Sequence, residues 1–257
     1  MTRVLIIADM EGVIGIERKE ACDPRLPEYE AGAQLLAAEI NVVAAAARQA
    51  GAMSVSVIDW HAGGGNLKQE MLNVGVEIVP EDFSPGYDVV LLTGFHAMAG
   101  TTDAFISHTM SQRVTLEMNG EQAGELALLS RWAGDEGVPV AIATGDRAAT
   151  VESKRFLPGT PTLTVKDTLS WERAQALPPK QAYEQIHRAV VRAVSDRDGW
   201  RIYQSRTPVH FRIKLNPESA TATKIPWLSR DADGWLVGQV DSTKDVIDLI
   251  DVLTALA

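Results

Sequence analysis

The chain has 257 residues, of which 46% are apolar and 23% charged, and its formal net charge at pH 7 is −10. This length and composition predict a soluble globular protein with one large domain or two modest ones. The acidic charge argues against a nucleic-acid or anionic-membrane surface as the main partner, because phosphate groups attract basic patches. Cys22 is the sole cysteine, so an intrachain disulfide and a thiolate metal cluster are both excluded.

No segment of the sequence is typical of a secretion signal or a membrane-spanning helix. The first apolar run, residues 4–8, ends at Asp9 and is shorter than the roughly 7–15-residue apolar core of a signal peptide. No uninterrupted apolar run reaches the roughly 18–20 residues that span a bilayer. We therefore expect a cytoplasmic protein without a membrane partner.

The first two thirds of the chain alternate apolar strands with helices. Residues 3–8 form a continuous β-branched run, which predicts a strand covered on both faces, and residues 9–27 predict a long irregular loop. Residues 32–50 predict a helix that ends before Gly51. Further strands are expected at residues 53–59, 76–79, 87–93, 113–118 and 139–144, a hairpin turn at Asn119-Gly120, and a helix at residues 124–136.

This alternation predicts an α/β fold with a doubly wound, mostly parallel sheet. In the last third the pattern changes, since residues 178–194 predict an amphipathic helix and residues 210–215 alternate as a half-exposed strand does. Apolar residues recur at helical spacing over residues 244–256. We expect an α/β core over residues 1–165 and a smaller α+β lobe over residues 166–257, whose final helix packs back on the core.

Carboxylates and imidazoles follow several of the predicted strands. The residues in such positions are Asp9, Glu11, Asp59, His61, His96 and His108. If the sheet is parallel, the carboxyl ends of its strands meet at one edge, so these side chains can share one crevice. Imidazole and carboxylate ligands without thiolate suit Zn²⁺, with Mn²⁺, Fe²⁺ or Co²⁺ as substitutes.

Each of these residues alone also has a purely structural explanation. Aspartate at a strand–loop junction often serves turn chemistry, and a lone loop histidine is more often hydrogen-bonded than metal-bound. Glu125 opens a predicted helix, where the helix dipole favours a carboxylate, and Asp146 is placed as a turn or helix-cap residue ahead of Arg147. Only the joint pattern favours a metal site.

Six short motifs occur in the order in which one known family has them. They are Asp9-Met10-Glu11-Gly12, Asp59-Trp60-His61, Gly94-Phe95-His96-Ala97, Ser107-His108-Thr109-Met110, Gly124-Glu125-Leu126 and Gly145-Asp146-Arg147. In these motifs the sequence resembles the D-aminopeptidases of the DppA type, peptidase family M55. The resemblance runs from the first strand to about Lys166, roughly two thirds of the chain.

The resemblance implies a two-zinc aminopeptidase that hydrolyses short peptides with D-amino acids at the N-terminus. It implies that Asp9 bridges both ions, that Glu11 and His96 bind one ion, and that His61 and Glu125 bind the other. It also implies a ring-like homo-oligomer, a decamer in the family's best-known member, with the active sites facing an internal chamber.

His108 matches the catalytic histidine of the family, which is described there as a nucleophile. General acid–base action toward a metal-bound water and the leaving amine is the chemical alternative. The loop around His108 departs from the family pattern, since the gap from His96 is one residue longer and the gap to Glu125 one shorter. Trp60 replaces a small polar residue. We expect both departures to touch the substrate pocket and not the ligands.

Two other functions stay open. A two-metal hydrolase of another amide or of a phosphoester would use the same ligands, but phosphate binding favours nearby basic residues, and only Arg147 and Lys166 are obvious candidates. A catalytically silent metal-binding protein with a structural role in an oligomer is the third possibility.

Overall fold

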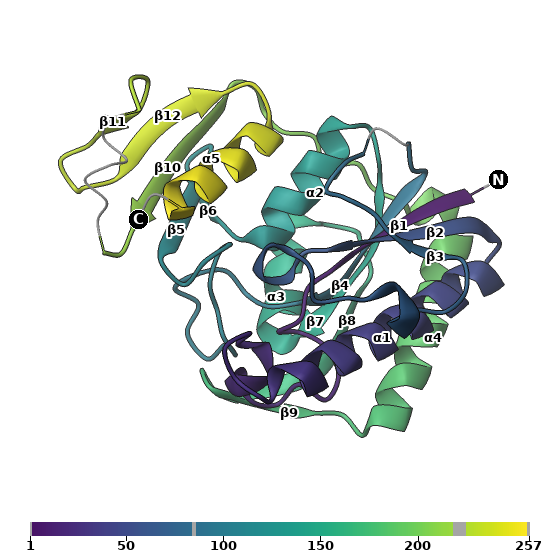
Figure 1. The fold of residues 1–257 in the computed structure, drawn as a ribbon. Coiled ribbons are helices and arrows are strands. Elements are labelled where there is room, and N and C mark those ends of the chain that lie inside the picture. Colours follow the sequence, from purple (N-terminus) through teal and green to yellow (C-terminus); the bar gives the residue numbers. More distant parts are fainter. Residues whose placement is uncertain (1, 84–85, 218–224, 256–257) are drawn as a thin grey trace.

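The computed structural model describes residues 2–83, 86–217 and 225–255 (Figure 1). Its main sheet has the strand order β3 (Val76–Ile78), β2 (Ala52–Asp59), β1 (Thr2–Ala8), β4 (Val89–Phe95), β7 (Val140–Asp146), β8 (Thr162–Ser170) and β9 (Arg173–Ala176). All neighbouring strands in this sheet are parallel except β8 and β9, which are antiparallel. The predicted α/β fold with a mostly parallel sheet is confirmed.

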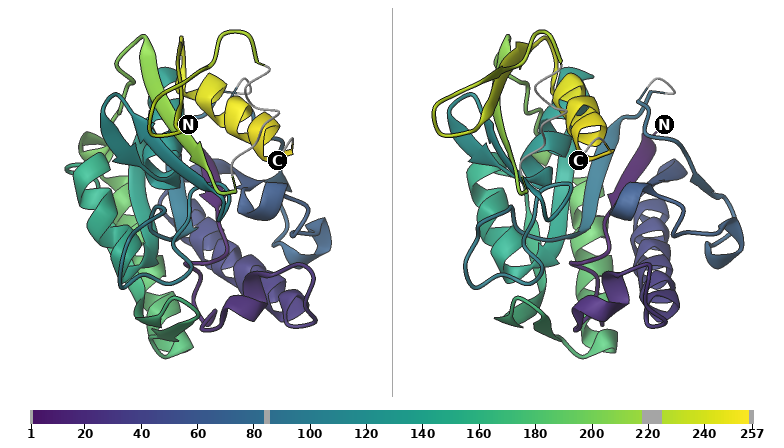
Figure 2. Two further views of the ribbon diagram at one scale, coloured as in Figure 1. Left: turned by 90° about the vertical axis from the view of Figure 1, so that its left-hand side faces the viewer. Right: turned by 60° about the vertical axis from the view of Figure 1, so that its left-hand side comes forward.

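Helices cover both faces of the main sheet (Figures 1 and 2). One face carries α1 (Tyr29–Gln49) and α4 (Pro179–Ser195), and the other carries α2 (Glu125–Asp135) and α3 (Arg147–Phe156). The sheet is therefore doubly wound, as the sequence predicts. No helix in the described ranges is long and apolar enough to cross a lipid bilayer.

The apolar run of β1 explains its central position. Val4, Ile6 and Ala8 belong to the core cluster that contains α1 and α4, whereas Leu5 and Ile7 belong to the cluster that contains α2. All five side chains are fully buried. Because alternate residues of a strand point to opposite faces, only a continuous apolar run satisfies both faces at once.

A second, antiparallel sheet lies beside the main one (Figure 1). Its strand order is β11 (Ser229–Arg230), β12 (Leu236–Val240), β10 (Val209–Leu215), β5 (Val114–Met118) and β6 (Glu121–Ala123). The predicted turn at Asn119-Gly120 joins β5 to β6, with φ angles of 50° and 84°. Helix α5 (Thr243–Ala255) packs against α2 and β10.

The expected division of the chain at residue 165 falls inside β8. The second sheet takes strands from both sides of that point, because β5 and β6 precede it and β10 follows it. Strands β8 and β9 and helix α4, all beyond or across it, belong to the main layers. The last residue of the predicted C-terminal helix, Leu256, lies outside the described residues.

A buried lysine holds the loop that follows β1. The side chain of Lys166 on β8 is buried, and its Nζ donates hydrogen bonds to the carbonyl oxygens of Val13 at 3.0 Å and Ile16 at 2.6 Å. Glu39 of α1 holds the same loop through a backbone amide, since Glu39 Oε2 accepts the N–H of Ile14 at 2.8 Å. These bonds fix the loop against the sheet.

Lys166 makes the stability of the protein depend on pH. Burial lowers the pKa of Lys166 from 10.5 to about 8, and the neighbouring Cys22, Asp146, Glu39 and Glu11 offset only part of this effect. Between these two pKa values the unfolded chain binds more protons than the folded one, so the free energy of unfolding of the wild type rises with pH.

The Lys166→Met variant has no amine to titrate at this position, so Lys166's contribution to the rise of the free energy of unfolding with pH is absent. Between pH 8 and pH 10.5 the wild type should therefore gain up to about 3 kcal/mol of stability relative to the variant. Denaturant unfolding of both chelator-treated proteins at a series of pH values measures the difference. Parallel stability curves for the two proteins would contradict a buried, charged Lys166.

Candidate metal centre

The predicted site residues converge on one edge of the main sheet. Asp9 follows β1, His61 follows β2 and His96 follows β4. These three strands are neighbours and parallel, so their carboxyl ends lie side by side. Glu125 is the first residue of α2, and His108 lies in the loop between β4 and β5. The convergence expected from the sequence is therefore present.

Two glycines allow the turn after β1 to cross the end of β4. The N–H of Gly12 donates to the carbonyl oxygen of Gly94 at 2.7 Å. A Cβ on Gly12 would lie 2.1 Å from the carbonyl oxygen of Phe95, and one on Gly94 would lie 2.1 Å from that of Asp9. Gly94 also has a φ of +77°. Only glycine fits both positions, and the crossing brings the side chains of the two strand ends together.

Asp9 lies between two imidazoles. Its Oδ1 is 3.5 Å from Nδ1 of His61, and its Oδ2 is 3.3 Å from Nε2 of His96. Glu11 Oε2 lies 2.9 Å from His61 Nδ1, and Glu125 Oε1 lies 3.2 Å from His96 Nε2. All five residues are buried. These contacts group Glu11 with His61 and Glu125 with His96, whereas the resemblance implied the opposite pairing of the two glutamates.

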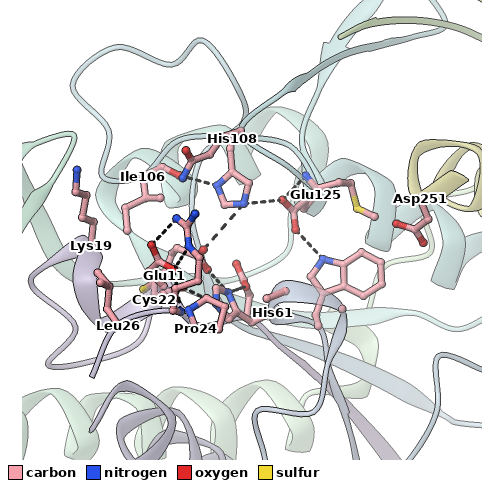
Figure 3. Close-up of a pocket in the computed structure, with 18 of the residues that line it drawn as sticks. Glu11, Lys19, Cys22, Pro24, Leu26, His61, Ile106, His108, Glu125 and Asp251 are labelled. Atoms are coloured by element: carbon pink, nitrogen blue, oxygen red, sulfur yellow. Dashed lines mark hydrogen bonds and ion pairs between the residues drawn. The ribbon is translucent and has the colours of Figure 1, made fainter. Parts of the chain in front are cut away.

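His108 completes the cluster from above (Figure 3). Its Nε2 lies 3.7 Å from Glu125 Oε1 and 4.0 Å from Glu11 Oε1. Its ring stacks on that of His96, with the ring centroids 3.9 Å apart and the planes 11° apart. With 13% of its side chain exposed, His108 is the most accessible of the three clustered histidines.

Each of the three clustered imidazoles has one ring nitrogen bound to a backbone carbonyl. The pairs are His61 Nε2 with Cys22 O at 3.0 Å, His96 Nδ1 with Ala97 O at 2.9 Å, and His108 Nδ1 with Ile106 O at 2.8 Å. A carbonyl oxygen only accepts, so these nitrogens carry the hydrogen. The opposite nitrogens face the carboxylates, and each presents either a second proton or a lone pair that can bind a metal ion.

Burial and mutual charge shift the pKa values in this cluster. Burial and the adjacent Glu11 raise the pKa of Asp9 to about 7. Although burial acts in the opposite direction, the carboxylates raise the pKa of His61 to about 11 and that of His96 well above its ordinary value. Burial and the positive charge of His96 lower the pKa of His108. The protons on His61 and His96 thus neutralise the carboxylates when no metal ion does so.

Two buried polar atoms of this cluster have no hydrogen-bond partner in the described part of the chain. Among the described residues, Asp9 Oδ2 and His96 Nε2 are buried without a hydrogen-bond partner, although they lie 3.3 Å apart. Such atoms are rare because burying an unpaired polar group is costly. The described residues include two groups whose candidate ligand atoms lie within 4.8 Å of one another, Asp9 with Glu11 and His61, and His96 with His108 and Glu125. Imidazole nitrogens and carboxylate oxygens are ligands that zinc accepts, so this donor set fits zinc.

The cluster opens into a pocket of about 530 Å³. Its apolar lining includes Leu26, Trp60, Ile106 and Met110, and the charged residues Lys19, Arg25, Glu81 and Asp251 also line it. Figure 3 shows Glu11, His61, His108 and Glu125 pointing toward one another in this pocket, with Lys19 and Asp251 at opposite sides. The volume is that of an ordinary small-ligand site.

The two basic residues named as phosphate-binding candidates lie outside the pocket lining. Arg147 forms an ion pair with Asp167, and Lys166 is buried beneath the loop after β1. The pocket has its own cations in Lys19 and Arg25, but Lys19 pairs with Glu172 and Arg25 pairs with Asp23.

Two aspartates in comparable positions serve the backbone instead. Asp59 at the end of β2 accepts the N–H groups of Asn66 at 2.7 Å and Leu67 at 3.0 Å, which organises the following loop. Asp146 accepts the N–H of Ala149 at 2.7 Å and caps α3, as the sequence analysis expected. Neither residue belongs to the candidate ligand groups found among the described residues.

Two N–H groups that donate hydrogen bonds to Glu125 were not predicted from the sequence. Trp60 Nε1 donates a hydrogen bond to Glu125 Oε2 at 2.6 Å, and the N–H of Met110 donates to Glu125 Oε1 at 2.6 Å. The expectation that Trp60 touches only the pocket is therefore wrong. Its position directly before His61 was the one available signal.

The chain was compared with known protein families, curated proteins and solved structures. The Peptidase_M55 family model, described as D-aminopeptidase, matches residues 2–252. A D-aminopeptidase of Bacillus subtilis (strain 168) is 30% identical over 206 residues, which cover 76% of this chain and 75% of that protein. The solved structure of the Zn-dependent D-aminopeptidase DppA from Bacillus subtilis, described as a self-compartmentalizing protease, superposes with a TM-score of 0.92 and 25% identity, covering 99% of this chain and 97% of that one. The chain belongs to the M55 family of D-aminopeptidases.

Proposed function

We propose that this chain is a zinc-dependent aminopeptidase that hydrolyses short peptides with N-terminal D-amino acids. The observation that carries this proposal is the buried cluster in which Asp9 presents one oxygen to His61 and the other to His96. Family membership and the descriptions of the similar proteins, D-aminopeptidase and Zn-dependent, support the same chemistry.

Two zinc ions per chain are proposed, with Asp9 as the bridging ligand. The distances favour His61 and Glu11 on one side of Asp9, and His96 and Glu125 on the other. When bound, a pair of zinc ions polarises the scissile carbonyl and supplies an activated water at neutral pH.

His108 is the proposed proton carrier. Its Nδ1–H is held by the carbonyl oxygen of Ile106, so a neutral ring presents the Nε2 lone pair to the pocket beside Glu11 and Glu125. Burial lowers the pKa of His108, which favours the neutral form. This ring can accept a proton from the attacking water and return it to the leaving amine, which is chemically easier than direct attack by imidazole.

The walls of the pocket suit a peptide better than a phosphoester. Acidic Glu81 and Asp251 line the pocket, so carboxylates are available to the free amino group of a peptide. A phosphoester would need unpaired cations, and both pocket cations already form ion pairs.

We also propose that the chain assembles into a ring-like homo-oligomer of ten subunits and that it acts in the cytoplasm. Its support is the resemblance of the motifs and the description of the similar solved protein as a self-compartmentalizing protease. Light scattering on the size-fractionated protein measures the number of subunits directly.

Replacing Asp9 and Glu11 should have unequal effects on metal content. Asp9→Ala removes the proposed bridge and should abolish binding of both ions, whereas Glu11→Ala should retain one. Elemental analysis of zinc per chain after dialysis checks both variants, with Asp59→Asn as a control at a buried carboxylate that only organises a loop. Two zinc ions per chain in Asp9→Ala would rule out the bridging role.

A substrate screen tests the reaction itself. Zinc-loaded protein should hydrolyse D-alanyl dipeptides faster than the matching L-dipeptides, and a chelator should abolish this activity. A generic phosphoester should not be cleaved. Faster cleavage of the phosphoester would favour the phosphoesterase function, and bound zinc without any chelator-sensitive hydrolysis would favour a non-catalytic protein.

His108→Ala should separate catalysis from metal binding. We expect the variant to keep both zinc ions and to lose about 10²- to 10⁴-fold in kcat, the usual contribution of a positioned acid–base group. His210→Ala, which removes an exposed histidine of β10, is the matched control. Loss of zinc from His108→Ala would show that this histidine is a ligand.

A further inference from the structure

The indole of Trp60 is a buried polar group that the proposed reaction does not use. Trp60 is the residue after β2, it is 6% exposed, and its backbone N–H donates to the carbonyl oxygen of Ala8 at 2.9 Å. Its indole Nε1–H donates to Glu125 Oε2 at 2.6 Å. An indole has one hydrogen-bond donor, and in Trp60 this donor binds the carboxylate of Glu125.

The two oxygens of Glu125 have different surroundings. Oε1 accepts the N–H of Met110 at 2.6 Å and lies 3.2 Å from His96 Nε2. Oε2 accepts the indole N–H of Trp60. Two donors that bind the two oxygens from different elements fix the rotation of the carboxylate and keep Oε1 on the side of His96. Glu125 begins α2 behind Gly124, which has no side chain to assist this placement.

We infer that Trp60 is a positioning residue of the metal centre, whose Nε1–H holds Glu125 so that Oε1 faces the ion beside His96. This inference rests on the proposed function, because it requires Glu125 to be a metal ligand. Groups that hydrogen-bond to a ligand typically contribute about 10- to 100-fold to metal affinity. The contacts of His61 with Asp9 and Glu11 do not involve the indole, so we expect its effect to be confined to the ion on the Glu125 side.

The test compares two tryptophan-to-phenylalanine variants of the full chain. Trp60→Phe keeps an aromatic ring in the pocket wall and removes the donor to Glu125. Trp200→Phe removes an equivalent donor, since Trp200 Nε1 donates to the carbonyl oxygen of Ala193 at 2.9 Å, but this bond joins residues near the end of α4 and not the site. Chelator-treated proteins are titrated with Zn²⁺ in competition with a chromophoric chelator.

We expect Trp60→Phe to bind one of its two zinc ions about 10- to 100-fold more weakly than the wild type and the other ion unchanged. Trp200→Phe should bind both ions as the wild type does. In the hydrolysis assay, kcat of Trp60→Phe should fall at low free zinc and rise again as free zinc is increased. A variant with a merely damaged fold would not recover in this way.

The outcomes separate this inference from the proposed function. If the wild type and Trp60→Phe bind two zinc ions equally tightly, the positioning role is wrong and the proposed function stands. If Trp60→Phe weakens both ions equally, the indole supports the fold around the site and not Glu125, which also overturns the inference. If the wild type binds no zinc, the proposed function fails and the role of Trp60 fails with it.

Discussion

The burial of three carboxylates and two imidazoles at one edge of the sheet, with a third imidazole partly buried beside them, is the constraint on which the rest of the structure depends. Removing a single ion from water costs several kcal/mol even after the protein relaxes, so this cluster opposes folding unless its charges are balanced. The unpartnered atoms Asp9 Oδ2 and His96 Nε2 show that the side chains do not balance one another completely. Cations at the centre would couple β1, β2, β4 and α2 to one another, and metal binding would then contribute to folding.

The backbone around this cluster is held in conformations that ordinary sequences avoid. Ile106 and Met110, on either side of His108, have φ angles of 45° and 60°, and Ala62 after His61 has a φ of 51°. Residues with a Cβ rarely adopt such φ angles. These angles persist where the surrounding structure enforces them. Here the enforcing contacts include the bond from His108 Nδ1 to the carbonyl oxygen of Ile106. The strained segments are therefore the ones that orient the imidazoles.

The sequence predicts the parts of this architecture that depend on local patterns. Segments rich in apolar and β-branched residues identify β1, β2, β4 and β7, and the parallel order of β1, β2 and β4 brings Asp9, His61 and His96 to one edge of the sheet. Strand β8 escapes prediction because Lys166, Asp167 and Thr168 interrupt its apolar pattern. Those polar residues are stabilised by distant partners, such as the loop carbonyls that Lys166 binds.

Contacts between residues far apart in the chain have no local signal. Trp60 and Glu125 are 65 positions apart, and apart from the position of Trp60 directly before His61, nothing in either motif indicates that an indole N–H meets that carboxylate. The same reason explains the strand pairing of β5 with β10, which places residues 114–118 in the second sheet although a strand there is predictable. The grouping of Glu11 with His61 likewise depends on side-chain rotamers that spacing does not determine.

The second sheet and α5 contribute to the site through α2. This helix begins at Glu125, packs on β4 and β7 of the main sheet, and contacts α5 on its other side. Lys244 of α5 lies over the ring of Trp132 of α2, with its Nζ 5.3 Å from the ring centroid. Asp251 of α5 also reaches the pocket lining. A helix that is packed on both sides cannot shift along its axis without breaking contacts in both layers. The second sheet is therefore part of what fixes the position of Glu125, and a chain lacking it would retain Asp9, Glu11, His61 and His96 without a fixed Glu125 beside them.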